Sequence, residues 1–178
     1  MRTPVEPRRR AVLAAGFAMA LPSACAAAES ANTLSPWQPK ARPGLQAVDL
    51  KSGEARSLAD FVGHALVINF WASWCAPCRL ELPTLNAAMD RYAARGLRLL
   101  AVNHGEMPER VDHFLQEVPI HGTVLLDRSQ TQLRAWGARG LPASFVLDAK
   151  GRPRFSAFGE IDWTAPPVLE ALESVGAG

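Results

Sequence analysis

Apolar residues gather into short continuous runs along most of this chain, and the residues between the runs repeat with a longer period. Residues 65–71 read ALVINFW and are almost continuously apolar, as in a strand covered on both faces. Similar or alternating runs predict five more strands. They lie at residues 45–50, 97–103, 123–126, 143–148 and 154–158.

Helical periodicity separates several of these runs. From residue 76 to about residue 94, apolar side chains recur every three or four positions and define one helix face. Shorter helices are expected at residues 109–117, 131–136 and 165–174, with a turn of helix or loop at 57–61. Alternating strands and helices followed by a hairpin, with its turn at 149–151, predict an α/β fold. Its sheet should be parallel in the middle with an antiparallel edge.

The first 28 residues do not fit this fold. Three arginines at positions 8–10 precede the apolar stretch AVLAAGFAMAL, 11 residues that are too few to span a bilayer, and small residues follow. We therefore expect an export signal at residues 1–28, cut after Ala28. Residues 9–13 also fit the core of a twin-arginine signal, so both the twin-arginine and the Sec route stay open. The alternative is an uncleaved N-terminus that tethers the protein to the membrane.

Cleavage changes the charge and the cysteine content of the chain. The net charge of +2 becomes −1, because 15 basic and 16 acidic side chains remain. No clustered basic patch indicates nucleic-acid binding. Cys25 leaves with the signal, unless it is a lipidated residue, and the exported protein then keeps only Cys75 and Cys78. Residues 29–43 contain three prolines and are expected to form an extended leader before a single domain at residues 44–178.

The two remaining cysteines form a C-x-x-C motif, WCAPCRLE, where the buried strand gives way to the long helix. Unpaired N–H groups and the helix dipole favour a thiolate at Cys75. Cys78 is within bridging distance and can resolve a mixed disulfide, while Pro77 suits the first helical turn. The alternative, a structural zinc site, needs four ligands, and the four histidines show no paired spacing. The pattern favours redox chemistry.

Two motifs carry a family resemblance. NFWASWCAPCRLELP, followed about 60 residues later by GLPASFVLD, resembles the thioredoxin superfamily, and within it the exported TlpA/ResA-like thiol-disulfide reductases. The resemblance covers about residues 44–175. It implies a thioredoxin-like three-layer sandwich, in which a central mixed sheet has helices on both faces.

The resemblance also implies roles for individual residues. Cys75 would be the exposed nucleophile and Cys78 the buried resolving thiol. Pro142 would follow a cis peptide bond, in a loop that lies against the disulfide and pairs with the substrate backbone. The substrate-binding residues expected from this likeness are Trp74, Pro77, Leu141 and Pro142.

One position separates this chain from thioredoxins themselves. Those proteins carry a buried aspartate where Asn69 stands, and an asparagine cannot accept a proton from the second cysteine. The TlpA/ResA-like proteins place a glutamate where Glu81 stands. Cys78 and Glu81 are three residues apart on one helix face, so a partly buried carboxyl could exchange protons with the thiol. Ala143 is a further departure, since the cytochrome c maturation branch usually has an acidic residue there.

These features predict a periplasmic enzyme that reduces disulfides in partner proteins such as apocytochrome c or copper-site proteins. A membrane thiol donor would re-reduce it, and no cofactor is required. The alternative is a copper-delivery protein that binds Cu(I) through the cysteines and His104 or Met107. A disulfide-forming oxidase is disfavoured, because the strongly oxidising members of the superfamily carry a histidine between the cysteines and this chain has Ala76 and Pro77.

Overall fold

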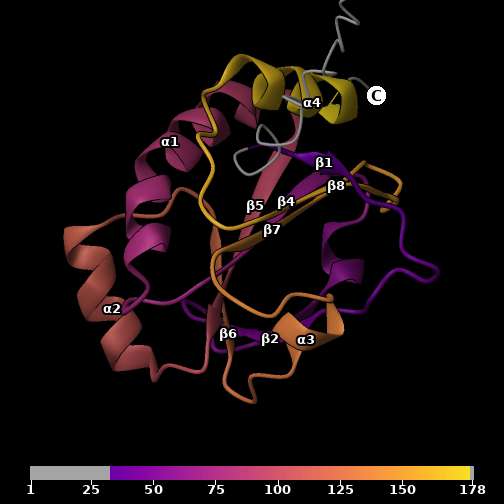
Figure 1. Cartoon of the computed structure of the whole chain (residues 1–178). Coiled ribbons are helices and arrows are strands. Elements are labelled where there is room, and N and C mark those ends of the chain that lie inside the picture. Colours follow the sequence, from indigo (N-terminus) through magenta and orange to yellow (C-terminus); the bar gives the residue numbers. More distant parts are fainter. Residues whose placement is uncertain (1–32, 177–178) are drawn as a thin grey trace, which may run out of the picture.

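One mixed sheet organises the computed structural model, which describes residues 33–176 (Figure 1). The strands are β1 Ser35–Pro36, β2 Gln46–Asp49, β3 Ala55–Ser57, β4 Ala65–Trp71, β5 Leu97–His104, β6 Thr123–Asp127, β7 Ala143–Leu147 and β8 Pro153–Phe158. Their order across the sheet is β1-β8-β7-β4-β5-β6-β2-β3. Strands β4, β5 and β6 are parallel, and every other pairing is antiparallel. The parallel centre is confirmed, but antiparallel strands flank it on both sides rather than one.

The helices also follow the sequence periodicity. The helical segments are η1 Leu58–Phe61, α1 Ala76–Tyr92, η2 Ala93–Arg95, α2 Pro108–Glu117, α3 Gln132–Ala135 and α4 Pro166–Gly176. Every predicted helix is present, within a few residues of the predicted bounds. The proposed export signal, residues 1–28 with Cys25, lies outside the described residues.

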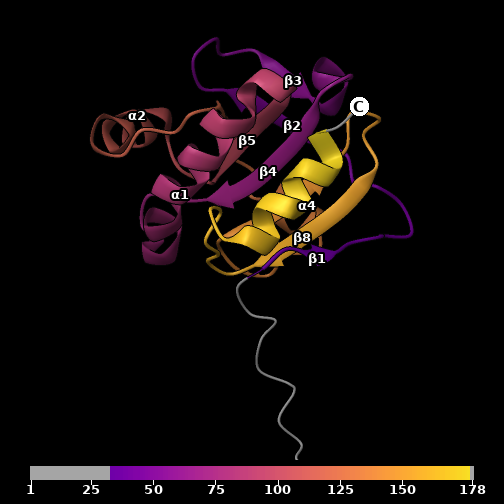
Figure 2. The same ribbon diagram turned by 90° about the horizontal axis from the view of Figure 1, so that it is seen from above.

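The sheet separates two hydrophobic clusters, because successive side chains of a strand point to opposite faces. Val67 and Trp71 of β4 face a cluster that includes the apolar sides of α1, α2 and α4. Ile68 and Phe70 face a second cluster, which is covered by η1 and α3. Figure 2 shows α1 and α4 on the same side of the sheet, and the Tyr92 hydroxyl joins them by donating to the Leu169 carbonyl. This is the expected three-layer arrangement, with short helices on the second face.

The segment expected to be an extended leader is part of the sheet. Its residues Ser35 and Pro36 pair with β8, and the Trp37 N–H donates to the Arg154 carbonyl at 2.9 Å. Leu34 is buried, and the Trp37 ring lies 4.8 Å from that of Phe145. The folded unit therefore begins before residue 44, the start expected from the sequence.

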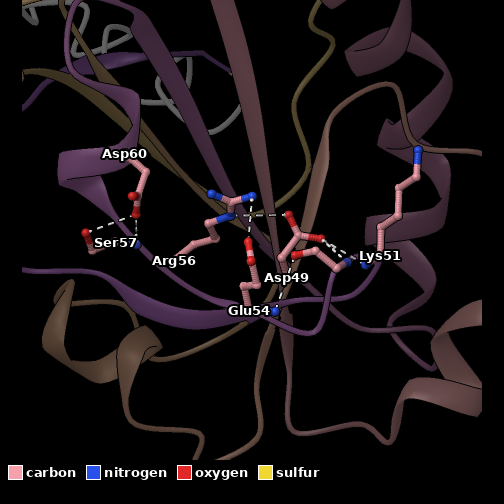
Figure 3. A network of polar contacts seen from close by, with 7 residues as sticks. Asp49, Lys51, Glu54, Arg56, Ser57 and Asp60 are labelled. Carbon is pink, nitrogen blue, oxygen red and sulfur yellow. Dashed lines mark hydrogen bonds and ion pairs between the residues drawn. The ribbon is translucent and has the colours of Figure 1, made fainter.

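The opposite edge of the sheet is the hairpin of β2 and β3, which is held by polar contacts (Figure 3). Asp49 accepts hydrogen bonds from the backbone of the turn and lies 3.7 Å from the Arg56 guanidinium, which also contacts Glu54. Ser57 and Asp60 then form a capping box at the start of η1. None of these residues lies in the cysteine motif, so this network serves the fold. Within the described residues, no helix is long and apolar enough to cross a membrane.

Candidate functional site

The cysteine motif lies at the junction between β4 and α1, as the sequence indicates. Cys75 is the N-cap of α1, and its sulfur accepts the Cys78 N–H at 3.3 Å. Pro77 occupies the first turn, where its missing N–H costs no hydrogen bond. The two cysteines form a disulfide with a Cα–Cα distance of 5.3 Å. A thiolate at Cys75 would meet the positive end of the helix dipole.

The two cysteines differ less in exposure than the family resemblance implies. Cys75 is 5% exposed and Cys78 is 1% exposed, so Cys75 is not the exposed residue that was expected. In this oxidised form its sulfur is bonded to Cys78 and capped by that residue's N–H, and its side chain packs in the hydrophobic cluster around α1. Trp74, which precedes it, is 61% exposed. The indole therefore forms the accessible surface beside the motif.

Glu81 is a buried carboxyl one turn beyond Cys78. It is 1% exposed, and it accepts hydrogen bonds from Asn69 Nδ2 at 2.7 Å and from the Ile161 N–H at 3.3 Å. Burial raises the pKa of Glu81 to about 7, against the opposing effect of these two hydrogen bonds. A carboxyl with that pKa can both accept and donate a proton near neutral pH.

Asn69 orients this carboxyl from the middle of β4. Its Nδ2 donates to Glu81 and also, at 2.9 Å, to the Ser144 hydroxyl on β7. Its Oδ1 is buried and has no hydrogen-bond partner among the residues that the structure describes. Asn69 therefore acts as a neutral donor to Glu81, in keeping with its inability to take up a proton.

A second buried carboxyl, Glu106, holds the other side of the junction. Its oxygens accept the Ser73 N–H at 2.7 Å, the Ser73 hydroxyl at 2.5 Å and Asn103 Nδ2 at 2.7 Å. Arg110 Nε lies 2.8 Å from the same carboxylate. Gly105, with φ of +85°, makes the turn that brings Glu106 back toward Ser73. These contacts fix the backbone two residues before Cys75.

The partners of the two carboxyls explain their different charge states. Burial tends to raise the pKa of Glu106 as well, but hydrogen bonds from Ser73, Asn103 and Arg110 outweigh it and lower that pKa below its ordinary value. Glu81 has no cation among its hydrogen-bond partners in the described chain. One carboxyl is therefore kept ionised, and the other is poised to exchange a proton.

The sequence did not reveal the Glu106 network. In VNHGEM the side chains of His104 and Met107 are the candidate metal ligands, whereas Glu106 between them makes the buried contacts. One signal was available, because Asn103 lies near the end of a parallel strand and Glu106 follows it, at the same sheet edge as the cysteine motif.

The loop before β7 contains the expected cis peptide bond between Leu141 and Pro142. Leu141 is half-buried and packs against both hydrophobic clusters. A cleft of about 320 Å³ opens beside this bond, lined by Arg139, Leu141, Pro142, Phe158 and three glycines. Phe158 is 57% exposed there, and an extended peptide could lie across this apolar wall.

His104 and Met107 are the residues that the copper alternative would add to the cysteines. His104 ends β5, and its buried Nδ1 has no hydrogen-bond partner in the described part of the chain, while Met107 is 49% exposed. Between residues 33 and 176, no three His, Cys, Asp or Glu side chains gather in a way that could hold a metal ion. In this form the two cysteine sulfurs are bonded to each other, which is the oxidised state of dithiol chemistry.

Comparisons with known proteins agree with this geometry. Residues 40–155 match the AhpC/TSA family. The thiol-disulfide oxidoreductase ResA of Geobacillus thermodenitrificans is 32% identical to this chain over 133 residues, which is 75% of each chain. The ResA of Bacillus anthracis is 30% identical over 121 residues, which is 68% of this chain and 69% of that protein. A crystal structure of a putative thiol:disulfide interchange protein DsbE from Chlorobium tepidum superposes with a TM-score of 0.65 and 32% identity. It covers 80% of this chain and 95% of its own.

Proposed function

The chain belongs to the AhpC/TSA family and is a thiol-disulfide oxidoreductase with a thioredoxin-like fold, and we propose that it works as a reductant of disulfides in exported partner proteins. The observation that carries the dithiol chemistry is the disulfide at the N-terminus of α1, with Glu81, a buried carboxyl with a pKa of about 7, one turn further along that helix. The reducing direction is proposed from Ala76 and Pro77, which stand where strongly oxidising members of the superfamily carry a histidine. Apocytochrome c and copper-site proteins are the proposed substrates. The disulfide is itself the redox centre, so no cofactor takes part.

The first step is attack by the Cys75 thiolate on one sulfur of the substrate disulfide. That bond breaks, a mixed disulfide with Cys75 forms, and the released substrate thiolate takes a proton from solvent. The N-terminus of α1 stabilises the attacking thiolate, and the contacts of Glu106 with Ser73 hold the turn that presents it.

The second step releases the reduced substrate. Glu81, as a carboxylate, takes the proton of Cys78, whose thiolate then attacks the Cys75 sulfur and displaces the second substrate thiolate. The protonated Glu81 then gives this proton to the released substrate thiolate and returns to the carboxylate form. Two electrons and two protons have then passed to the substrate, and the enzyme is left with the disulfide seen in the structure.

The completed cycle needs a source of electrons outside the cytoplasm. We propose a thiol donor in the membrane, because the compartment outside the cytoplasmic membrane is kept oxidising. The basic and apolar pattern of residues 1–28 supports export to the periplasm, with a membrane tether as the outcome if the segment stays in place.

Trapping tests the proposed chemistry directly. Cys78→Ser should stall at the mixed disulfide, so partner proteins stay covalently bound to Cys75 and are released by dithiothreitol. Cys75→Ser is the matched control and should trap nothing. Equal trapping by both variants would contradict the assignment of Cys75 as the nucleophile.

The reduction potential tests the direction of electron flow. Residues 29–178 are equilibrated in graded dithiol buffers, and the fluorescence change expected from Trp74 follows the redox state. A reductant should titrate near or below the roughly −270 mV of thioredoxin. A potential near the roughly −120 mV of DsbA would make the protein a donor of disulfides instead.

A further inference from the structure

We propose that a basic pocket beside the cysteine motif binds an acidic side chain of the substrate polypeptide, close to the disulfide that is reduced. The pocket has a volume of about 370 Å³ and is lined by Ser73, Arg79, Arg110, His113, Phe114 and Glu117. Ser73 lies two residues before Cys75, and Arg79 follows Cys78 directly. The inference rests on the function proposed above, and it adds a preference among substrates.

Arg110 offers donors that the protein does not use. Its Nε donates to the Ser73 hydroxyl at 3.1 Å and to Glu106 at 2.8 Å, which fixes the plane of the guanidinium. Its two terminal nitrogens make no hydrogen bond or ion pair with the described residues, and its side chain is 64% exposed. A guanidinium held in this way presents a pair of N–H groups that match a carboxylate.

Arg79 supplies the second positive charge. Its guanidinium lies 5.2 Å from the centre of the Phe114 ring, a cation–π contact with one wall of the pocket. No ion pair with any described residue neutralises it. Arg79 follows Cys78 directly, so the second charge of the pocket comes from the first turns of the helix that begins at the disulfide.

The pocket is polarised along α2. Arg110 lies in the first turn of that helix and Glu117 ends it, so the two are about 10 Å apart along the axis. Glu106, the acidic group nearest Arg110, accepts from Arg110 Nε as well as from Ser73 and Asn103, so it balances one of the two arginine charges and leaves the terminal nitrogens of Arg110 without a partner in the described chain. The positive end of the pocket therefore faces the cysteine motif, and the negative end faces away. One carboxylate at the near end fits this arrangement better than a run of acidic residues.

The proposed occupant is the side chain of a Glu or Asp close in sequence to the cysteine that Cys75 attacks. It would complement the apolar cleft at Leu141 and Pro142, which offers apolar walls and a single arginine. The basic pocket would thus select among substrates, while the cleft accepts an extended peptide of broad sequence.

Paired peptides test this preference. Each synthetic peptide carries one disulfide and is otherwise neutral, and one position near the attacked cysteine is scanned as Glu or as Gln. Stopped-flow mixing with reduced enzyme gives a second-order rate constant for each. At one or more positions the Glu peptide should react about fivefold faster than its Gln partner, the size expected for an exposed ion pair. The ratio should fall toward one in 0.5 M salt, as screening requires.

Arginine variants test whether the ratio of the Glu-peptide to the Gln-peptide rate constant depends on the pocket. Arg79→Gln and Arg110→Gln should each reduce the Glu-to-Gln ratio, because each removes one of the two charges. Arg95→Gln is the matched control. Its guanidinium lies 5.5 Å from the Tyr92 ring at the far end of α1, so the ratio should stay at the wild-type value. Each ratio compares two substrates on one enzyme, so a change in cysteine reactivity caused by a variant cancels.

The outcomes separate the two proposals. Equal rates for the Glu and Gln peptides at every position in low salt would overturn the basic pocket and leave the reductase function intact. A preference that survives in both arginine variants would also overturn it. If the enzyme reduces none of the peptides, acidic or neutral, the proposed function itself fails.

Discussion

Glu81 and Glu106 are both buried carboxyls near the cysteine motif, and the number and kind of their hydrogen-bond donors separate their chemistry, because Ser73, Asn103 and Arg110 all donate to Glu106. Glu106 has a guanidinium at 2.8 Å, whereas the donors to Glu81 are an amide side chain and a backbone N–H. Burial without a cation leaves Glu81 with a pKa of about 7. The residue that can move a proton is thus the one that lacks a salt bridge.

The raised pKa of Glu81 predicts how stability depends on pH. Because the folded protein binds this proton more tightly than the unfolded chain, whose value is 4.5, the stabilisation is complete below pH 4.5 and is lost as the pH rises through 7. The loss is about 3 kcal/mol between pH 4.5 and 8. Urea denaturation of the oxidised protein at several pH values measures it.

Glu81→Gln replaces the carboxyl that titrates with an amide. This variant should lack that pH slope, because its amide does not ionise. It should also be less stable than wild type at pH 5, because the amide has only one oxygen to accept from Asn69 and Ile161. A variant that keeps the wild-type slope would show that another group is responsible.

Glu106→Ala should destabilise the oxidised protein strongly. It leaves the Ser73 N–H, Asn103 and the Arg110 guanidinium without their acceptor, at a cost of about 2–4 kcal/mol. Urea unfolding at pH 7 measures the change in unfolding free energy. Glu109→Ala, at an exposed position three residues further on in α2, is the control and should change it by less than about 0.5 kcal/mol. Similar losses in both variants would contradict the structural role of Glu106.

At the scale of elements, the sequence predicted the strands and helices whose hydrophobic pattern lies within their own residues. The strand at Ala65–Trp71 and the helix from Ala76 could be placed from their patterns alone, since a run with six apolar residues in seven, or four helical turns, is long enough to show the pattern. Strands β1 and β3 have two and three residues, and their conformation is set by the strands that they pair with. The Glu106 network likewise joins β4, β5 and α2, which no local pattern brings together.

The segment that contains β1 and Trp37, which pairs with β8, should contribute measurably to the free energy of unfolding. Trp37→Ala removes a half-buried ring that stacks on Trp136 at 5.7 Å and contacts Phe145, so it should lower the unfolding free energy by about 2 kcal/mol. Trp74→Ala makes the same substitution at a ring that is 61% exposed, and it should change stability by less than about 0.5 kcal/mol. Urea denaturation compares the two. Equal effects would mean that the leader does not stabilise the domain.

At the scale of the whole molecule, the site is assembled from segments that are distant in sequence. β4 contributes Asn69 and leads into the cysteines, β5 leads to Glu106, the loop before β7 contributes the cis-proline, and Ile161 follows β8. Parallel strands β4 and β5 end at the same edge, which brings the first two together. Glu81 is surrounded in this way only in the folded protein, because Asn69 on β4 and Ile161 after β8 lie far from it in sequence.

The shortness of the disulfide loop predicts that the fold does not depend on it. Cys75 and Cys78 are three positions apart, so the bond closes a ring of only four residues. In the chain-entropy account, so small a ring restricts the unfolded chain by about 2 kcal/mol, against nearly 5 for a loop of 100 residues. The double variant Cys75→Ser, Cys78→Ser should therefore remain folded and lose about that amount in urea, and unfolding at 25 °C without denaturant would contradict this. The enzyme can open and close this covalent cross-link at every turnover while its architecture stays intact.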